Sequence, residues 1–257
     1  MDKMKITSLQ NAIVKQVKEL QSKKTARKKQ GLFVVEGYRG VKELPAREGL
    51  IEYLVVTEKQ VDEIPAHLVI KKCYVVTEEI FAKISETQSP QGMLAVVKMP
   101  AYTLSSLDIS EGAYIILENL QDPGNLGTII RTAHAFGFKG VLMTKGSVDA
   151  FSPKVVRATM SALFYVPIIV DETIDAYVEA FKVARTPLYV TALHEKAQNI
   201  KTMQFPKNLG LIIGNEGNGV TDYCIEQADK LMIIPMPGGA ESLNASVAAS
   251  ICMYAMM

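Results

Sequence analysis

The chain has no tryptophan, only three cysteines and only three histidines among 257 residues, and these shortages disfavour several kinds of site. The cysteines lie far apart, without the close pairs of a zinc site or the even number of a disulfide framework: Cys73, Cys224 and Cys252. The histidines are equally scattered: His67, His134 and His194. A metal site and a Cys–His dyad are therefore disfavoured, and we expect reduced thiols in a cytoplasmic protein.

Long apolar runs and the common nucleotide-binding fingerprints are also missing. No uncharged apolar run reaches 18 residues, and residues 1–6 lack the apolar core of a secretory signal, so we expect neither a membrane span nor a leader. The sequence contains no G-x-x-x-x-G-K-[ST] loop and no G-x-G-x-x-G turn, which argues against the P-loop and nicotinamide-binding classes. Hydrophobic residues make up 48% of the chain, enough for one or two domains with a sizeable core.

The net charge of +1 hides an unequal distribution of charge. Residues 1–30 contain nine lysines and arginines against Asp2 and Glu19, a net charge of +7, which leaves −6 on the rest of the chain. Five of these cations form a dense cluster: Lys23, Lys24, Arg27, Lys28 and Lys29. We interpret the cluster as a phosphate-binding arm, and the pattern leaves open a solvated helix face.

The first hundred residues predict a compact α/β unit. Apolar residues spaced by three and four predict an amphipathic helix over 8–22. Further strands are expected at 32–37, 53–57, 68–70, 73–76 and 93–97, and helices near 38–48 and 77–85. Between 98 and 111, proline, serine and glycine interrupt the apolar pattern. We therefore divide the chain into a domain at 1–98, a linker at 99–110 and a domain at 111–257.

The second half alternates predicted strands with predicted helices. Strands are expected at 114–117, 140–143, 188–192, 210–213 and 231–234, and helices at 127–136, 153–163, 174–184 and 243–256. Alternation of this kind predicts an α/β fold, a mostly parallel sheet with helices on both faces. Ligands of such sheets gather at the carboxyl ends of the strands, where three loops of unusual composition fall.

The first of these loops, residues 118–125, leads into the predicted helix 127–136. On that helix Arg131 lies roughly opposite the apolar side chains. A cation in the first turn opposes the helix dipole, so a bound anion such as phosphate would compensate. An exposed surface arginine is the alternative.

Glycine and small polar residues mark the other two loops. Residues 213–219 carry three glycines, which let backbone approach a ligand closely, with Glu216 between two of them; a simple turn is the alternative. Residues 235–247 run from a Gly-rich turn into the last helix, where Ser242 and Asn244 are placed to cap free N–H groups.

Taken in order, the three loops resemble the motifs of SpoU-type (TrmH-type) RNA ribose 2′-O-methyltransferases of the SPOUT superfamily. The matching stretches are Asn125-Leu-Gly-Thr-Ile-Ile-Arg131-Thr-Ala, Ile213 to Gly219, and Ile234 to Ala248. Residues 1–98 resemble the family's RNA substrate-binding domain through Phe33-Val-Val-Glu36-Gly37 and Thr87-Gln-Ser-Pro-Gln91-Gly92. The last helix departs from the pattern, ending Met253-Tyr-Ala-Met-Met257 where relatives often carry an acidic residue.

The resemblance implies a C-terminal SPOUT α/β-knot domain with a deep trefoil knot, preceded by a smaller α/β RNA-binding domain. It implies S-adenosylmethionine as cofactor and a homodimer with an active site shared across the interface. Carried over position by position, the residues expected at the cofactor are Ala192, Gly214, Asn215, Ile234 and Leu243.

The same resemblance implies roles in methyl transfer for Arg131, Glu216, Ser242 and Asn244, and an RNA contact for Asn125. A guanidinium has a pKa above about 12, so we expect Arg131 to hold a phosphate and stabilise a developing alkoxide rather than accept a proton. Glu216 is expected to hold Arg131 or an active-site proton. Ser242 and Asn244 are expected to orient ribose, phosphate or cofactor.

Ribosomal RNA is the substrate that the resemblance favours, and transfer RNA is the second candidate. Two other classes stay open: a non-catalytic RNA-binding protein on the same fold, and a small-molecule enzyme on a nucleotide-binding α/β fold. The intact motif residues argue against the first, and the basic N-terminal segment argues against the second.

Overall fold

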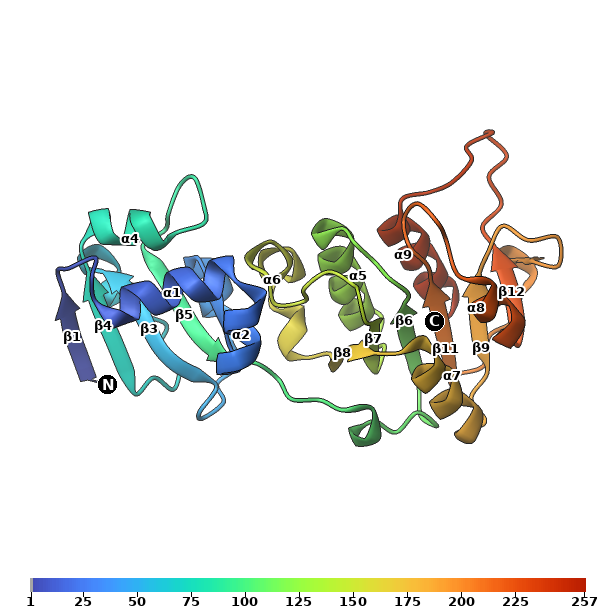
Figure 1. Cartoon of the computed structure of the whole chain (residues 1–257), viewed down its shortest axis with the longest axis horizontal. Helices are drawn as coiled ribbons and strands as arrows, with labels where there is room; N and C mark the ends of the chain where they lie inside the picture. The colour runs from blue at the N-terminus through green and yellow to red at the C-terminus, as the bar shows by residue number, and fades with distance from the viewer. Residues whose placement is uncertain (1) are drawn as a thin grey trace. The chain divides into compact units, whose positions relative to one another are not determined.

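The computed structural model describes residues 2–257, which form two units, each with its own sheet (Figure 1). The first unit comprises the chain up to Pro100 together with Phe151–Phe164, and the second comprises Ala101–Ala150 and Tyr165–Met257. The chain leaves the first unit inside the segment 98–111, where its composition changes. The membership of Phe151–Phe164 in the first unit has no counterpart in the sequence pattern.

The first unit is built on a five-stranded sheet of order β1-β4-β3-β5-β2. Its strands are β1 (Asp2–Ile6), β2 (Leu32–Glu36), β3 (Ile51–Thr57), β4 (Lys72–Val76) and β5 (Met93–Lys98). Its helices are α1 (Ala12–Ser22), α2 (Lys24–Gln30), α3 (Tyr38–Lys42), α4 (Glu78–Ile84) and α6 (Pro153–Thr159). Strands β1, β4 and β3 run parallel, whereas β5 is antiparallel to both β2 and β3.

The amphipathic helix predicted at 8–22 is confirmed as α1, whose buried Val14, Val17 and Leu20 join one core with α4 and the sheet. Two other expectations for this unit are wrong. Residues 68–70 form no strand, and the helix expected over 38–48 ends at Lys42, shortly before Pro45, a residue that cannot donate to a helix ladder.

Aromatic contacts fasten Phe151–Phe164 to the first unit. The ring of Phe33 on β2 lies 5.1 Å from the ring of Phe151 and 5.9 Å from that of Phe164, measured between centroids. All three side chains are buried, and α6 packs against β2. Removing residues 1–98 would therefore expose this aromatic cluster, so such a truncation is a poor test of what the first unit does.

The second unit is built on a seven-stranded sheet of order β10-β12-β9-β11-β6-β7-β8, in which every strand pair is parallel. Its strands are β6 (Ala113–Leu117), β7 (Gly140–Thr144), β8 (Ile168–Glu172), β9 (Leu188–Thr191), β10 (Gln198–Asn199), β11 (Leu209–Ile213) and β12 (Lys230–Ile233). Its helices are α5 (Pro123–Ala135), α7 (Ile174–Val183), α8 (Asp222–Gln227) and α9 (Ala245–Ala255). The predicted parallel α/β fold is thus confirmed.

Helices cover both faces of this sheet (Figure 1). Tyr177 and Phe181 of α7 pack with Tyr114 and Ile116 of β6 in one buried cluster that also includes Cys224 of α8. Side chains alternate along a strand, so Ile115 faces the other way, toward the layer where α5 and α9 pack against each other. Short 3₁₀ turns complete the chain at Glu58–Glu63, Leu104–Ser106, Ala162–Phe164 and Ile200–Thr202. Within residues 2–257, no helix has the length and apolarity needed to cross a membrane.

Helix α5 begins four residues earlier than predicted. Asp122 is its N-cap and accepts a hydrogen bond from the Asn125 N–H at 2.8 Å, while Pro123 occupies the first turn. Proline is well suited to that position because its missing N–H would be unpaired there anyway. Arg131 therefore lies in the third turn of α5 and not in its first, so the prediction that it opposes the helix dipole is wrong.

Candidate functional site

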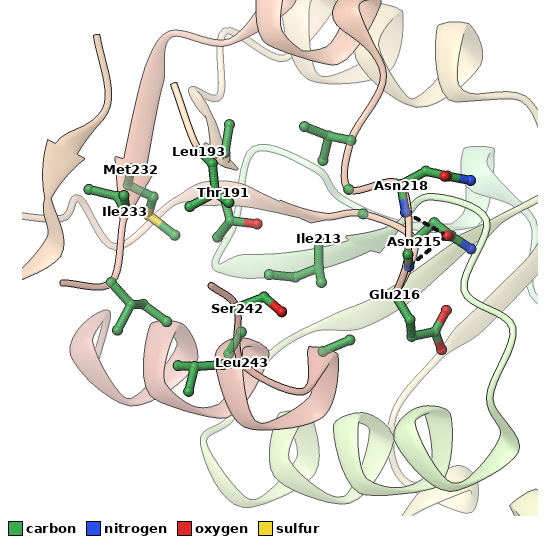
Figure 2. A pocket seen from close by; sticks show the side chains of 18 of the residues that line it. Thr191, Leu193, Ile213, Asn215, Glu216, Asn218, Met232, Ile233, Ser242 and Leu243 are labelled. Atoms are coloured by element: carbon green, nitrogen blue, oxygen red, sulfur yellow. Dashed lines mark hydrogen bonds between the residues drawn. The ribbon is translucent and has the colours of Figure 1, made fainter. Parts of the chain in front are cut away.

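A cavity of about 380 Å³ opens at the carboxyl ends of β9, β11 and β12 (Figure 2). Four segments form its wall: residues 191–193 after β9, 213–220 after β11, 232–236 at the end of β12, and the approach to α9 around Ser242 and Leu243. Small-molecule sites commonly enclose about 300–1,000 Å³. The cavity lies at the strand ends where the sequence predicts a ligand.

The tightest part of the wall is the loop that follows β11. A Cβ on Gly214 would lie 2.1 Å from the carbonyl carbon of Gly219 and 2.3 Å from the amide nitrogen of Val220, so only glycine fits. The loop is closed by two hydrogen bonds of 2.9 Å between the backbones of Asn215 and Gly219. Asn215 Oδ1 also accepts from the N–H groups of Gly217 and Asn218, at 2.9 and 3.0 Å. Side-chain and backbone bonds thus hold the loop in one shape.

All five residues predicted at the cofactor line this cavity: Ala192, Gly214, Asn215, Ile234 and Leu243. Glu216 and Ser242 line it as well. In Figure 2 apolar side chains such as Ile213 and Leu243 line the same pocket as the glycine loop, which is labelled at Asn215 and Asn218. Apolar side chains next to polar backbone suit a ligand with a flat heteroaromatic ring and a polar tail, and S-adenosylmethionine has both.

One hydrogen-bond network joins the three predicted loops. Glu216 accepts from the N–H groups of Gln121 and Asp122, at 3.0 and 2.8 Å, and from the side-chain amide of Asn125 at 3.1 Å. Asn125 Oδ1 accepts in turn from Asn244 Nδ2 at 2.8 Å. Since each contact spans more than 90 residues of sequence, the network sets how the loops sit relative to one another.

Asn244 is the N-cap of α9, as predicted. Its Oδ1 accepts from the N–H groups of Ser246 and Val247, at 3.0 and 3.3 Å, and from the Ser246 hydroxyl at 2.6 Å. Its Nδ2 is the group that donates to Asn125. One side chain therefore fixes both the start of α9 and the third loop.

The structure gives Asn125 a different role from the RNA contact expected of it. Its side chain is buried, with 6% exposure, and its amide is bonded on one side to Glu216 and on the other to Asn244. A side chain engaged in this way bridges the loops and presents little to an RNA.

Arg131 stands apart from this network. It lies on α5 with an exposed side chain, and within residues 2–257 no hydrogen bond or ion pair involves its guanidinium. The carboxylate of Glu216 is directed toward the loop before α5 (Figure 2), so the structure does not bring Glu216 and Arg131 together. The neighbouring Thr132 shares a hydrogen bond of 3.3 Å with Ser250 of α9, which leaves Arg131 on the open side of the helix pair.

The five residues of the basic cluster differ in burial: Arg27 is buried and the four lysines are exposed. Arg27 is buried, with 4% exposure, and donates to the backbone oxygens of Leu20 and Gln21 at the end of α1. It satisfies helix carbonyls that would otherwise lack a partner, so the expected RNA contact at this position is wrong. Lys23 lies 3.6 Å from Glu19 in an exposed ion pair. The side chains of Lys24, Lys28 and Lys29 are exposed.

One residue of this region was not anticipated from the sequence. Glu118 follows β6, is buried, and accepts from the Thr221 hydroxyl at 2.7 Å and from the Thr221 N–H at 2.9 Å. Thr221 is the N-cap of α8, directly after the glycine loop, so Glu118 anchors the far end of that loop. A carboxylate at a strand end beside a predicted ligand loop is a signal that would have identified it.

The electrostatics of Glu216 favour its ionised form. Burial opposes ionisation, but the hydrogen bonds from Asp122, Asn125 and Gln121 outweigh it and hold the pKa of this carboxyl below its ordinary value of 4.5. A depressed pKa means that ionised Glu216 stabilises the folded chain above pH 4.5, and that this contribution is lost as the pH falls through the folded-state pKa.

Replacing Glu216 with glutamine should therefore lower the melting temperature at neutral pH and have little effect in acid. Melting curves of wild type and Glu216→Gln at about pH 7, 5 and 3 test this prediction. The difference in melting temperature should shrink toward acid, because the wild-type carboxylate becomes protonated there. A difference in melting temperature that stayed constant across the series would contradict the assigned charge state.

Two family models match the chain, one in each half. Residues 112–254 match the SpoU rRNA Methylase family, and residues 11–95 match the MRM3-like substrate binding domain. The chain is 36% identical, over 97% of its own length and 97% of the relative's, to the 23S rRNA (guanosine(2553)-2′-O)-methyltransferase RlmP of Bacillus subtilis.

The chain also superposes on solved structures of RNA methyltransferases. The AdoMet-bound rRNA methyltransferase from Sinorhizobium meliloti superposes with a TM-score of 0.88 at 30% identity, over 99% of this chain and 97% of that one. The SpoU methyltransferase AviRb from Streptomyces viridochromogenes, in complex with AdoMet, superposes with a TM-score of 0.81 at 26% identity, over 96% and 97%. The chain belongs to the SpoU rRNA methylase family.

The predicted family, activity and cofactor are thereby confirmed. The protein is an RNA ribose 2′-O-methyltransferase that uses S-adenosylmethionine.

Proposed function

We propose that the substrate is ribosomal RNA, and that the cavity beside the glycine loop holds S-adenosylmethionine during the reaction. The carrying observation is the network from Glu216 through Asn125 to Asn244, which binds the three motif loops into one site next to that cavity. Support for ribosomal RNA comes from RlmP and from the Sinorhizobium meliloti protein, both of which are rRNA methyltransferases by name. Transfer RNA is the second candidate.

When bound, S-adenosylmethionine would supply an electrophilic methyl group, because its sulfonium sulfur can leave as a neutral thioether. The task of the chain is then to align a ribose hydroxyl with that methyl group and to stabilise the oxygen as its proton passes to solvent. Leu243 and the loop from Gly214 to Gly219 hold the cofactor, and Ser242 presents its hydroxyl at the cavity wall. Arg131, exposed and without a hydrogen-bond or ion-pair partner among residues 2–257, holds the phosphate next to the target ribose and stabilises negative charge on the attacking oxygen.

We also propose that the protein is a cytoplasmic homodimer whose second domain carries the trefoil knot. Helix α9 exposes large apolar side chains on the face next to α5: Val247, Ile251 and Tyr254, at 46, 38 and 68% exposure. A second copy covering this face would bury them and would bring a second Arg131 toward the interface. The cytoplasmic location is supported by three buried cysteines that form no disulfide.

Placing a charge on the apolar face of α9 should break the dimer. We expect Tyr254→Glu to elute as a monomer with its fold intact, because the side chain is mostly exposed within one chain. Light scattering after gel filtration measures the mass directly, and Tyr165→Glu, at another exposed tyrosine of the same unit, is the matched control. A Tyr254→Glu protein that kept the mass of a dimer would place the interface elsewhere.

Tritium transfer from labelled S-adenosylmethionine distinguishes the two substrate classes. Wild-type protein is incubated in parallel with a 23S rRNA transcript and with bulk transfer RNA. Label in the ribosomal transcript alone supports the proposal, whereas label confined to transfer RNA overturns the substrate assignment and leaves the enzyme class intact.

A further inference from the structure

A second cavity, of about 210 Å³, lies within the first unit. One wall is the turn from β2 into α3, with Glu36, Gly37 and Arg39, and Gln91 adjoins it. The opposite wall is the segment from Val156 to Phe164. Every lining residue belongs to the first unit, and none lines the cofactor cavity.

Hydrogen bonds to a buried carboxylate hold the wall at the end of β2. Glu36, at 8% exposure, accepts from Gln21 Nε2 at 3.2 Å, from the Glu86 N–H at 3.0 Å, from Thr87 Oγ1 at 3.0 Å and from the Ser85 hydroxyl. These bonds tie β2 to α1 and to the segment before β5. Because the carboxylate is saturated by internal donors, its charge is directed into the protein.

A hydrogen bond between Gln91 and Tyr38 also holds the wall at the turn from β2 into α3. Gln91 Oε1 accepts from the Tyr38 N–H at 2.8 Å and lies against Gly37. The two sequence motifs at 33–37 and 87–92, which have no part in the cofactor site, thus meet here. Such bonding pre-organises a wall, as binding sites require.

The opposite wall contains an unusual turn. Met160 and Ser161 are consecutive, neither is glycine, and both have positive φ, 48° and 65°. Residues other than glycine rarely adopt this conformation, and where they do the surroundings enforce it, most often at ligand sites. The turn closes α6 and brings the buried ring of Phe164 to the cavity.

Two arginines flank the opening. Arg39 uses its Nε for Glu43, at 3.3 Å, which leaves its terminal nitrogens available. Arg157, in the last turn of α6, is exposed, and its guanidinium has no hydrogen bond or ion pair within residues 2–257. Two planar guanidinium groups beside an apolar pocket combine the donors that phosphate prefers with a surface on which a base can pack.

We propose that this cavity holds one unpaired nucleotide of the RNA substrate, other than the nucleotide that is methylated. Arg39 and Arg157 bind its phosphate, and its base enters the pocket toward Phe164. The volume is below the usual range for a drug-sized ligand, which favours a single base with its phosphate outside. A concave pocket selects a splayed base, so the first unit reads loops or bulges rather than duplex. The inference rests on RNA being the substrate, as proposed above.

The test compares Arg39→Gln/Arg157→Gln with Arg39→Gln/Arg47→Gln. Arg47 is exposed in the same unit and lines neither described cavity, so both double variants remove two positive charges and only the first removes both flanking arginines. Fluorescence anisotropy with a labelled fragment of the RNA that wild type methylates gives the dissociation constant over a salt series. We expect the first variant to bind about tenfold more weakly than the second, with the salt slope reduced by about a further 0.7 for the lost phosphate contact.

Cross-linking of wild-type full-length protein to a 4-thiouridine-substituted transcript is the second measurement. We expect adducts on peptides containing 36–43 or 156–164. Equal RNA affinity in the two double variants, or adducts confined to other peptides, overturns the subsite. S-adenosylmethionine binding by calorimetry should be unchanged in both variants. Failure of wild type to methylate RNA would instead overturn the proposed function, so the two failures are distinguishable.

Discussion

Replacing Arg131 with alanine should lower the rate of methyl transfer at saturating RNA by about 10²–10³-fold, the usual cost of removing one electrostatic group from a transition state. Affinity for S-adenosylmethionine should stay within about twofold, because Arg131 does not line the cavity. The rate should fall because the guanidinium of Arg131 is exposed on α5 and has no partner within residues 2–257, so it is available to the substrate.

Two further variants sharpen this prediction. Arg131→Lys keeps the charge and loses the planar pair of donors, so we expect partial recovery of the rate. Lys207→Ala removes an exposed cation of the same unit away from the cavity, and should leave the rate unchanged. Single-turnover rates with calorimetric binding of S-adenosylmethionine measure both quantities. Wild-type turnover by Arg131→Ala would remove Arg131 from the reaction.

Replacing Gly214 with alanine should abolish measurable S-adenosylmethionine binding, a loss of about 100-fold or more. The new Cβ would lie 2.1 Å from the backbone of Gly219, and no side-chain rotation relieves a clash with backbone. The loop would have to open, breaking the pair of hydrogen bonds between Asn215 and Gly219. Calorimetry gives the affinity, and circular dichroism checks that the unit still folds.

Gly217 provides the matched control for this change, because it lies in the same loop and lines the same cavity. The nearest atom to a Cβ on Gly217 is Asn215 Oδ1 at 3.6 Å, an ordinary contact, so Gly217→Ala should bind the cofactor with nearly normal affinity. If Gly214→Ala and Gly217→Ala bound equally well, the rigid loop would not be the cofactor wall.

The glycine loop that we propose as the cofactor wall could be predicted from sequence because its conformation depends on adjacent residues. Gly214 and its neighbours must allow close backbone approach, and a run of glycines after an apolar strand predicts that directly. Asn244 could be identified as a cap in the same way, from its place before an apolar helix. Each inference needed only a few adjacent residues.

Other features depend on contacts between distant residues, and the sequence pattern missed or misread them. The family resemblance predicts an RNA contact for Asn125, whereas its partners, Glu216 and Asn244, come from segments 91 and 119 residues away. The basic cluster predicts a surface position for Arg27, which is instead buried and caps α1. The packing of Phe151 and Phe164 on Phe33 likewise has no local signal.

The start of α5 is predicted wrongly for a local reason. Proline and glycine interrupt a helical pattern, so the sequence predicts a loop at Asp122 and Pro123. Together they are the N-cap and first turn of a helix, and this moves Arg131 to the third turn. The exposure of Arg131 still supports its proposed role, although the dipole argument does not.

The identity of the methylated nucleoside is the most direct test of the central claim, that this site methylates a ribose hydroxyl of ribosomal RNA. A 23S rRNA transcript is incubated with wild-type protein and S-adenosylmethionine labelled in its methyl group, digested to nucleosides, and separated by chromatography with mass spectrometry. We predict label in a single 2′-O-methylated nucleoside, formed about 10²–10³-fold more slowly with Arg131→Ala. Label on a base, or none with wild-type protein, would contradict the claim.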